Sequence, residues 1–130
     1  MNLNQITLPS RDIKESIAFY TKMGFELIAE SAEYAQFRCP QGQAFLSIEK
    51  QAFGVNGNGV TVYFEIDDID GKVATLKARG IHFNQEVTDQ PWLWREARVL
   101  DPSGNSLCLY RPSKSHHLPL SLMEEEKALN

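Results

Sequence analysis

Hydrophobic and polar positions in the first half of the chain alternate, then recur at helical spacing, then alternate again. Residues 3–8 place Ile6 and Leu8 on one face of an extended segment, as in a half-buried strand. Asp12, with Glu15 three residues later, is typical of a helix start, and Gly24 suits the helix end. The intervening apolar stripe at i, i+4 and i+7 consists of Ile13, Ile17 and Tyr20. Further strands are predicted at residues 25–29, 34–38 and 44–50.

The same pattern begins again after residue 59. Residues 60–66 alternate, Asp68 suits a second helix start, and Gly80 suits the end of that helix. The second helical stripe consists of Ile69, Val73 and Leu76. Extended segments are predicted at residues 81–83, 94–100 and 106–111, with a turn at 101–105.

The two halves align as a repeat. An offset of 56 positions brings like residues together, pairing Ile6 with Val62, Leu8 with Phe64, Asp12 with Asp68, Ile13 with Ile69 and Gly24 with Gly80. The offset is 62 at the turns, where Pro40 matches Pro102, but 61 at the last strands, where Leu46 matches Leu107. The first half therefore carries one extra residue after its turn. We therefore predict an α+β fold of two β-α-β-β-β modules.

The modules are expected to form one domain over residues 1–112. Module 1 covers residues 1–50, residues 51–59 form a linker rich in Gly and Asn, and module 2 covers residues 60–112. Residues 113–130 form a tail outside both modules, with a short helix as one interpretation.

The composition argues against some classes of binding partner. The 130-residue chain has a net charge of -4 and no basic stripe, so nucleic acid and anionic membranes are not expected partners. No apolar run has the length of a membrane span, and the first residues do not resemble a signal peptide. Cys39 and Cys108 are too few for a disulfide framework, so we expect free thiols and a cytoplasmic location.

Three segments in order resemble the vicinal oxygen chelate superfamily, which includes glyoxalase I, bleomycin resistance proteins and extradiol dioxygenases. They are ITLPSRDIKESIAFYTKMGFEL, VYFEIDDIDGKVATLKARGIHF and PWLWREARVLDPSGNSLCLY. The resemblance covers about residues 3–111. It implies that the modules form a curved mixed sheet around a cavity for a small molecule, with the helices on the convex side. It also implies a homodimer, since many members are dimers with sites near the interface.

Metal-using members of the superfamily hold a divalent ion with one side chain from each of four strands. The resemblance carries these positions over to Gln5, Ser47, Thr61 and Cys108. Only Gln5 is a residue type that the superfamily uses as a ligand, and the hydroxyls are weak neutral donors. We therefore expect no cofactor.

A rearranged divalent-metal site from Gln5, Glu49 and Glu65 is the alternative, with the two carboxylates open to acid/base chemistry. The sequence leaves open whether the chain is an enzyme.

Without a metal ion, the predicted cavity can still serve as a binding pocket. Its predicted lining consists of Gln5, Thr7, Ser47, Glu49, Thr61, Tyr63, Glu65, Cys108 and Tyr110. Trp92 and Trp94 are candidates for stacking on a planar or cationic ligand, or else are core or interface residues. For Cys108 the simpler interpretation is a small buried apolar residue.

These features give one leading hypothesis: a metal-independent protein that binds or sequesters a small organic ligand. The alternatives are a divergent lyase, isomerase or dioxygenase with a displaced metal site, and a structural or regulatory dimer without a small ligand.

Overall fold

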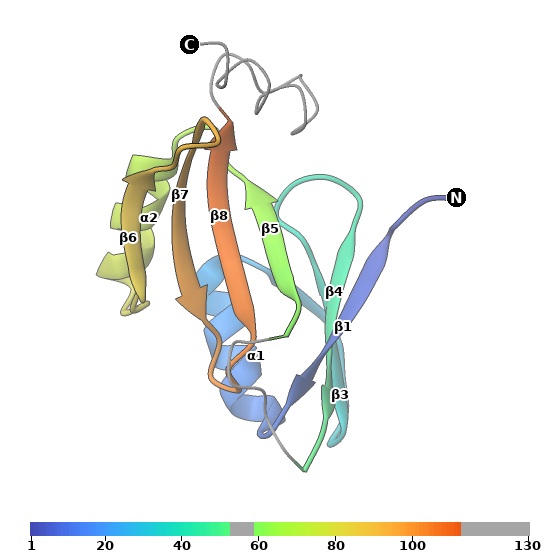
Figure 1. Ribbon diagram of the computed structural model, residues 1–130. Coiled ribbons are helices and arrows are strands. Elements are labelled where there is room, and N and C mark those ends of the chain that lie inside the picture. The colour runs from blue at the N-terminus through green and yellow to red at the C-terminus, as the bar shows by residue number, and fades with distance from the viewer. Residues whose placement is uncertain (53–58, 113–130) are drawn as a thin grey trace.

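The computed structural model describes residues 1–52 and 59–112, which form two four-stranded sheets, each covered by one helix (Figure 1). The α+β architecture predicted from the repeat is confirmed. The predicted tail and most of the predicted linker lie outside the described residues.

The first sheet comes entirely from the first half of the chain. Its elements are β1 (Gln5–Ser10), α1 (Ile13–Met23), β2 (Glu26–Glu30), β3 (Tyr34–Arg38) and β4 (Phe45–Lys50). The strand order is β1-β4-β3-β2, with β1 parallel to β4 and the other pairs antiparallel. The parallel pair is possible because α1 carries the chain back across the sheet.

The second sheet repeats this topology. Its elements are β5 (Thr61–Glu65), α2 (Ile69–Ala78), β6 (Gln85–Asp89), β7 (Trp94–Leu100) and β8 (Ser106–Pro112). The strand order is β5-β8-β7-β6, and β5 runs parallel to β8. Among the described residues, no helix is long and apolar enough to cross a membrane.

The strand register confirms the repeat and the offsets between its equivalent strands. Ile6 pairs with Leu46 in the first sheet, and Val62 pairs with Leu107 in the second. The first strands are therefore 56 positions apart and the last strands 61 apart, as the sequence predicted. The extra residue falls in the β3–β4 turn, where it leaves the parallel pairing unchanged.

The strand predicted at residues 81–83 is wrong. Ile81 and Phe83 are buried, but they lie in a coil segment, and the strand β6 begins only at Gln85. Alternating apolar residues indicated burial correctly, but burial does not require a strand. The edge strand β6 has the polar sequence QEVTD, so its own hydrophobic pattern is weak.

The helix ends form as predicted. Asp12 accepts a hydrogen bond from the backbone nitrogen of Glu15 at 3.1 Å, and Asp68 accepts one from Gly71 at 3.0 Å. Gly24 adopts a φ of 103° at the end of α1, a conformation that favours glycine.

The helices cover apolar sheet faces that merge into one core. The strand residues predicted to face the helices are all buried or packed against that core, namely Ile6, Leu8, Leu46, Ile48, Val62, Phe64, Leu107 and Leu109. Phe25 of module 1 and Phe64 of module 2 meet edge to face, with ring centroids 5.5 Å apart. The modules are therefore packed on each other within one chain.

Polar contacts from the β7–β8 turn also join the modules. The hydroxyl of Tyr20 on α1 donates a hydrogen bond to Asp101 Oδ2 at 2.6 Å. Asn105 Nδ2 donates to the carbonyl of Pro9 at 2.8 Å, and the backbone nitrogen of Arg11 donates to Ser103 Oγ at 2.9 Å. These bonds fix the second module against β1 and α1.

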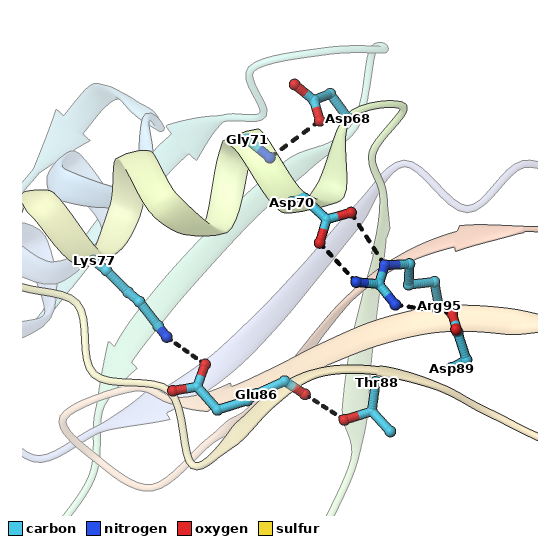
Figure 2. A network of polar contacts seen from close by, with 8 residues as sticks. All are labelled: Asp68, Asp70, Gly71, Lys77, Glu86, Thr88, Asp89 and Arg95. Carbon is cyan, nitrogen blue, oxygen red and sulfur yellow. Dashed lines mark hydrogen bonds and ion pairs between the residues drawn. The ribbon is translucent and has the colours of Figure 1, made fainter.

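On the helix side of the second sheet, Arg95 joins three elements. Its guanidinium pairs with Asp70 of α2 at 2.8 Å and with Asp89 of β6 at 3.0 Å, and Lys77 of α2 pairs with Glu86 (Figure 2). Successive residues of a strand point to opposite faces. Trp94 and Glu96, the neighbours of Arg95, therefore point away from α2.

Candidate functional site

The predicted site residues lie in two groups, one on each sheet. We call the face of each sheet that is turned away from its helix the open face. Among the described residues, no hydrogen bond or aromatic contact joins the group on one open face to the group on the other.

The open face of the first sheet carries a neutral hydrogen-bonding group. Gln5 Nε2 donates to Ser47 Oγ at 2.8 Å and to the hydroxyl of Tyr34 at 3.3 Å. The hydroxyls of Thr7 and Ser47 are 2.8 Å apart, and Gln36 Nε2 donates to Gln5 Oε1 at 3.3 Å. We call these five residues the amide–hydroxyl group. It offers both donors and acceptors without a formal charge.

Sequence reasoning missed Tyr34 and Gln36. Both belong to the open face, because they alternate along β3 with the buried residues Ala35 and Phe37. Tyr34 lies opposite the exposed Glu49 in the ladder. Applying the alternation of β3 to the cavity lining would have found them.

The open face of the second sheet carries three rings in mutual contact. Trp94 stacks on Tyr110 with centroids 4.3 Å apart, and Tyr63 meets each of these rings edge to face at 6.1 Å. We call these residues the aromatic cluster. Tyr63 is 48% exposed, so the cluster presents an aromatic surface to solvent. Such a surface suits a planar ligand.

Tyr110 keeps its proton at neutral pH. Burial raises the pKa of Tyr110, and the negative charge of Glu65 adds to the increase. Its hydroxyl therefore remains a hydrogen-bond donor beside the exposed Glu65 carboxylate.

A buried carboxylate lies beside the aromatic cluster. Glu96 is 1% exposed, and its Oε2 accepts hydrogen bonds from Arg98 Nε at 2.9 Å and Gln85 Nε2 at 3.4 Å. The thiol of Cys108 donates to the same oxygen at 3.5 Å. Arg98 also lies over the ring of Tyr63, 5.9 Å from its centroid. Glu96 was absent from the predicted site because no ligand role was assigned to β7 beyond Trp94.

The other predicted residues lie at the margins of these groups. Thr61 Oγ1 donates to Ser106 Oγ at 3.4 Å. Trp92 is half-buried in the β6–β7 turn, and no aromatic contact joins it to the aromatic cluster within the described ranges. Cys108 is fully buried, in agreement with the simpler interpretation of that residue.

The residues at the superfamily's metal positions do not fit a divalent ion. Gln5 and Ser47 bond to each other, while Thr61 and Cys108 are engaged within the second sheet. Burial, with the charge of Glu96, raises the pKa of Cys108 to about 12, so the thiol is protonated and is a poor ligand. Across residues 1–52 and 59–112, no group of three or more His, Cys, Asp or Glu side chains could hold a metal.

A separate groove of about 430 Å³ lies between the modules on the side of α1. It is lined by α1 residues such as Phe19 and Lys22, by the segment after α2 that includes His82, and by Leu100 and Pro102. None of the predicted site residues lines it.

A model of the Glyoxalase/Bleomycin resistance protein/Dioxygenase superfamily matches residues 2–109. The chain belongs to this superfamily. The family resemblance inferred from the sequence is therefore confirmed.

Relatives within the superfamily include resistance proteins. A bleomycin resistance protein of Geobacillus stearothermophilus is 29% identical over 125 residues, covering 83% of this chain and 95% of the relative. A glyoxalase/bleomycin resistance protein/dioxygenase from Nocardioides has 25% identity and a TM-score of 0.76, covering 88% of this chain and 85% of that one.

A crystal structure of a bleomycin-binding protein complexed with bleomycin shares the fold of this superfamily member. It has 22% identity and a TM-score of 0.69, and covers 87% of this chain and 99% of that one.

Proposed function

We propose that this superfamily member binds and sequesters a small organic ligand without a metal ion. One observation carries the proposal: an exposed aromatic cluster occupies the open face of the second sheet, while the metal positions hold neutral side chains. The names of the relatives support it, since they include a bleomycin resistance protein and a bleomycin-binding protein.

The ligand contacts follow from the two open faces. In this proposal the aromatic cluster stacks on the ligand, with Trp92 and Glu65 at its border. Gln5, Thr7 and Glu49 form hydrogen bonds to it from the other sheet. Three further residues pack beneath this surface or at its edge, namely Ser47, Thr61 and Cys108.

We further propose that the functional unit is a homodimer. No hydrogen bond or aromatic contact joins the amide–hydroxyl group to the aromatic cluster within residues 1–52 and 59–112, yet each forms one side of a binding surface. A second copy brings the open face of its first sheet to the second sheet of its partner. Light scattering coupled to gel filtration tests this, and a monomer at micromolar concentration would contradict it.

Titration with bleomycin, followed by tryptophan fluorescence, tests the binding function. We expect saturable quenching, with affinity lowered at least about tenfold by Trp94→Ala, because that ring stacks in the cluster. Arg95→Ala is the matched control, since the neighbouring side chain points to α2 and should leave affinity unchanged.

Metal analysis of protein purified without chelator completes the test. We expect far less than one divalent ion per chain, and the same bleomycin affinity after treatment with EDTA. A tightly held ion that is lost in Gln5→Ala or Glu49→Ala would refute metal independence. Failure to bind bleomycin or any member of a panel of planar heteroaromatic compounds would refute the binding function itself.

A further inference from the structure

We infer that Glu96 is the residue that selects the ligand, by accepting a hydrogen bond from an N–H group on the edge of a flat, cationic heteroaromatic molecule. This inference rests on the proposed binding function and specifies the ligand class of the same open face.

The first observation is an incomplete set of hydrogen bonds. Glu96 Oε2 accepts from Arg98, Gln85 and Cys108, whereas Glu96 Oε1 is buried and has no hydrogen-bond partner among residues 1–52 and 59–112. A carboxylate has acceptor sites on both oxygens, and a buried acceptor without a partner is costly. A ligand that supplies one N–H donor would remove this cost.

A second unpartnered atom lies nearby on the same strand. The indole nitrogen of Trp94 is also buried, and no hydrogen-bond partner for it lies in the part of the chain that the structure describes. Trp94 and Glu96 are two residues apart on β7 and therefore share its open face, whereas Arg95 between them points to α2. Two buried polar atoms without a hydrogen-bond partner in the described residues therefore belong to side chains on the same face of β7.

The position of Glu96 fits a ligand that stacks on the aromatic cluster. Glu96 lies directly opposite Tyr110 in the β7–β8 ladder, and the Tyr110 ring stacks on Trp94. Tyr63 contacts both rings and is nearly half exposed, so its movement would open the way to the carboxylate. A flat molecule on these rings would present its edge, rather than its face, to Glu96.

The equivalent place in the first sheet is complete. Glu49 and Tyr110 are equivalent positions, because the last strands of the two sheets are 61 residues apart. Tyr34 lies opposite Glu49, and Glu96 lies opposite Tyr110, so Tyr34 and Glu96 are equivalent as well. The Tyr34 hydroxyl already accepts a hydrogen bond from Gln5. The unpartnered carboxylate oxygen of Glu96 is therefore a feature of the second sheet and not of the fold as such.

The charges favour a cationic donor. Arg98 supplies one positive charge at Glu96, while Glu96 and Glu65 supply two negative charges on the same open face. An anionic ligand would be repelled, and a cation without N–H groups would leave Oε1 unpartnered.

Two acridine dyes of equal charge test the inference. Protonated 9-aminoacridine has N–H donors at its edge, whereas 10-methylacridinium has the same ring system and charge but no N–H group. For the wild-type protein we expect 9-aminoacridine to bind about tenfold or more tightly than 10-methylacridinium, as a hydrogen bond to a charged acceptor implies. The dissociation constants are measured by fluorescence titration.

Glu96→Gln should reduce this preference to about threefold or less, because the amide is a weaker acceptor. Glu33→Gln is the matched control, since it removes the same charge from an exposed turn outside both open faces and should keep the preference. Circular dichroism melting curves show whether Glu96→Gln folds. The wild-type preference between the two dyes tests the inference without any variant.

Equal wild-type affinities for the two dyes, or a preference unchanged in a folded Glu96→Gln protein, would overturn the role of Glu96. The same holds if the wild type binds neither dye. In each case bleomycin binding, tested separately, decides whether the proposed function still stands.

Discussion

Replacing Tyr20 by Phe should weaken the packing of the two modules on each other. The Tyr20 hydroxyl is buried on α1 and donates a hydrogen bond of 2.6 Å to Asp101 Oδ2 in the β7–β8 turn. Asp101 keeps its other partners, because Asn105 Nδ2 donates to Oδ2 at 2.8 Å and the backbone nitrogen of Ser103 donates to Oδ1 at 3.0 Å. The substitution thus removes one short bond and leaves the turn otherwise intact.

The expected loss of unfolding free energy is about 1.5–3 kcal/mol, the usual contribution of a hydrogen bond to a charged group. For a domain of this size, that corresponds to a decrease in Tm of about 5–10 °C. Urea unfolding followed by circular dichroism measures the difference directly.

Tyr34→Phe is the control for this experiment. The Tyr34 hydroxyl lies on an open face and accepts a 3.3 Å hydrogen bond from Gln5, so we expect a loss below about 0.5 kcal/mol. If Tyr20→Phe were as stable as the control, the bond between α1 and the β7–β8 turn would not stabilise the fold, and the reasoning would be wrong.

Three further predictions concern the core and its titrating groups. Phe64→Ala should lower the unfolding free energy by about 2–4 kcal/mol in urea, because it removes the ring contact with Phe25, and a loss below about 1 kcal/mol would contradict that. Raised pKa values of Tyr20 and Cys108 mean that the folded protein holds these protons more tightly than the unfolded chain, so stability should be complete below about pH 8.5 and fall as the pH rises towards 12. Cys108→Ala should reduce that fall, and an unchanged pH profile would refute the role of the thiol. At pH 8 the native protein should not react with a thiol reagent at Cys108, whereas urea should expose it; rapid labelling of native Cys108, detected by mass spectrometry, would show that it is not buried.

The repeat made most of the fold predictable. The match of Asp12 with Asp68 and of Gly24 with Gly80 predicted both helices. The fall in offset from 62 at the turns to 61 at the last strands indicated the extra residue between β3 and β4. These signals are local, because caps, stripes and turns depend on neighbouring residues. The polar edge strand β6 carried no such signal. The sequence therefore placed this strand too early, at the buried apolar residues Ile81 and Phe83 that precede it.

The candidate site was less predictable. Alternation gave the residues of each open face. It could not show that Glu96 Oε1 would lack a partner among the described residues, since this depends on where Arg98, Gln85 and Cys108 point. The amide–hydroxyl group likewise depends on the lateral order β1-β4-β3, which brings Gln36 to Gln5 across β4. Neither arrangement can be inferred from spacing along the chain.

The contact between Phe25 and Phe64 bears on how a fold of two repeated modules evolved. A single module of about fifty residues would be only marginally stable alone, and it would leave the ring of Phe25 or Phe64 in contact with water. An ancestor of half this length would therefore have gained stability by pairing with a second copy of itself. Gene duplication would have made that pairing intramolecular, after which the two halves could acquire different chemistry: hydroxyl and amide groups on one, stacked rings and a carboxylate on the other.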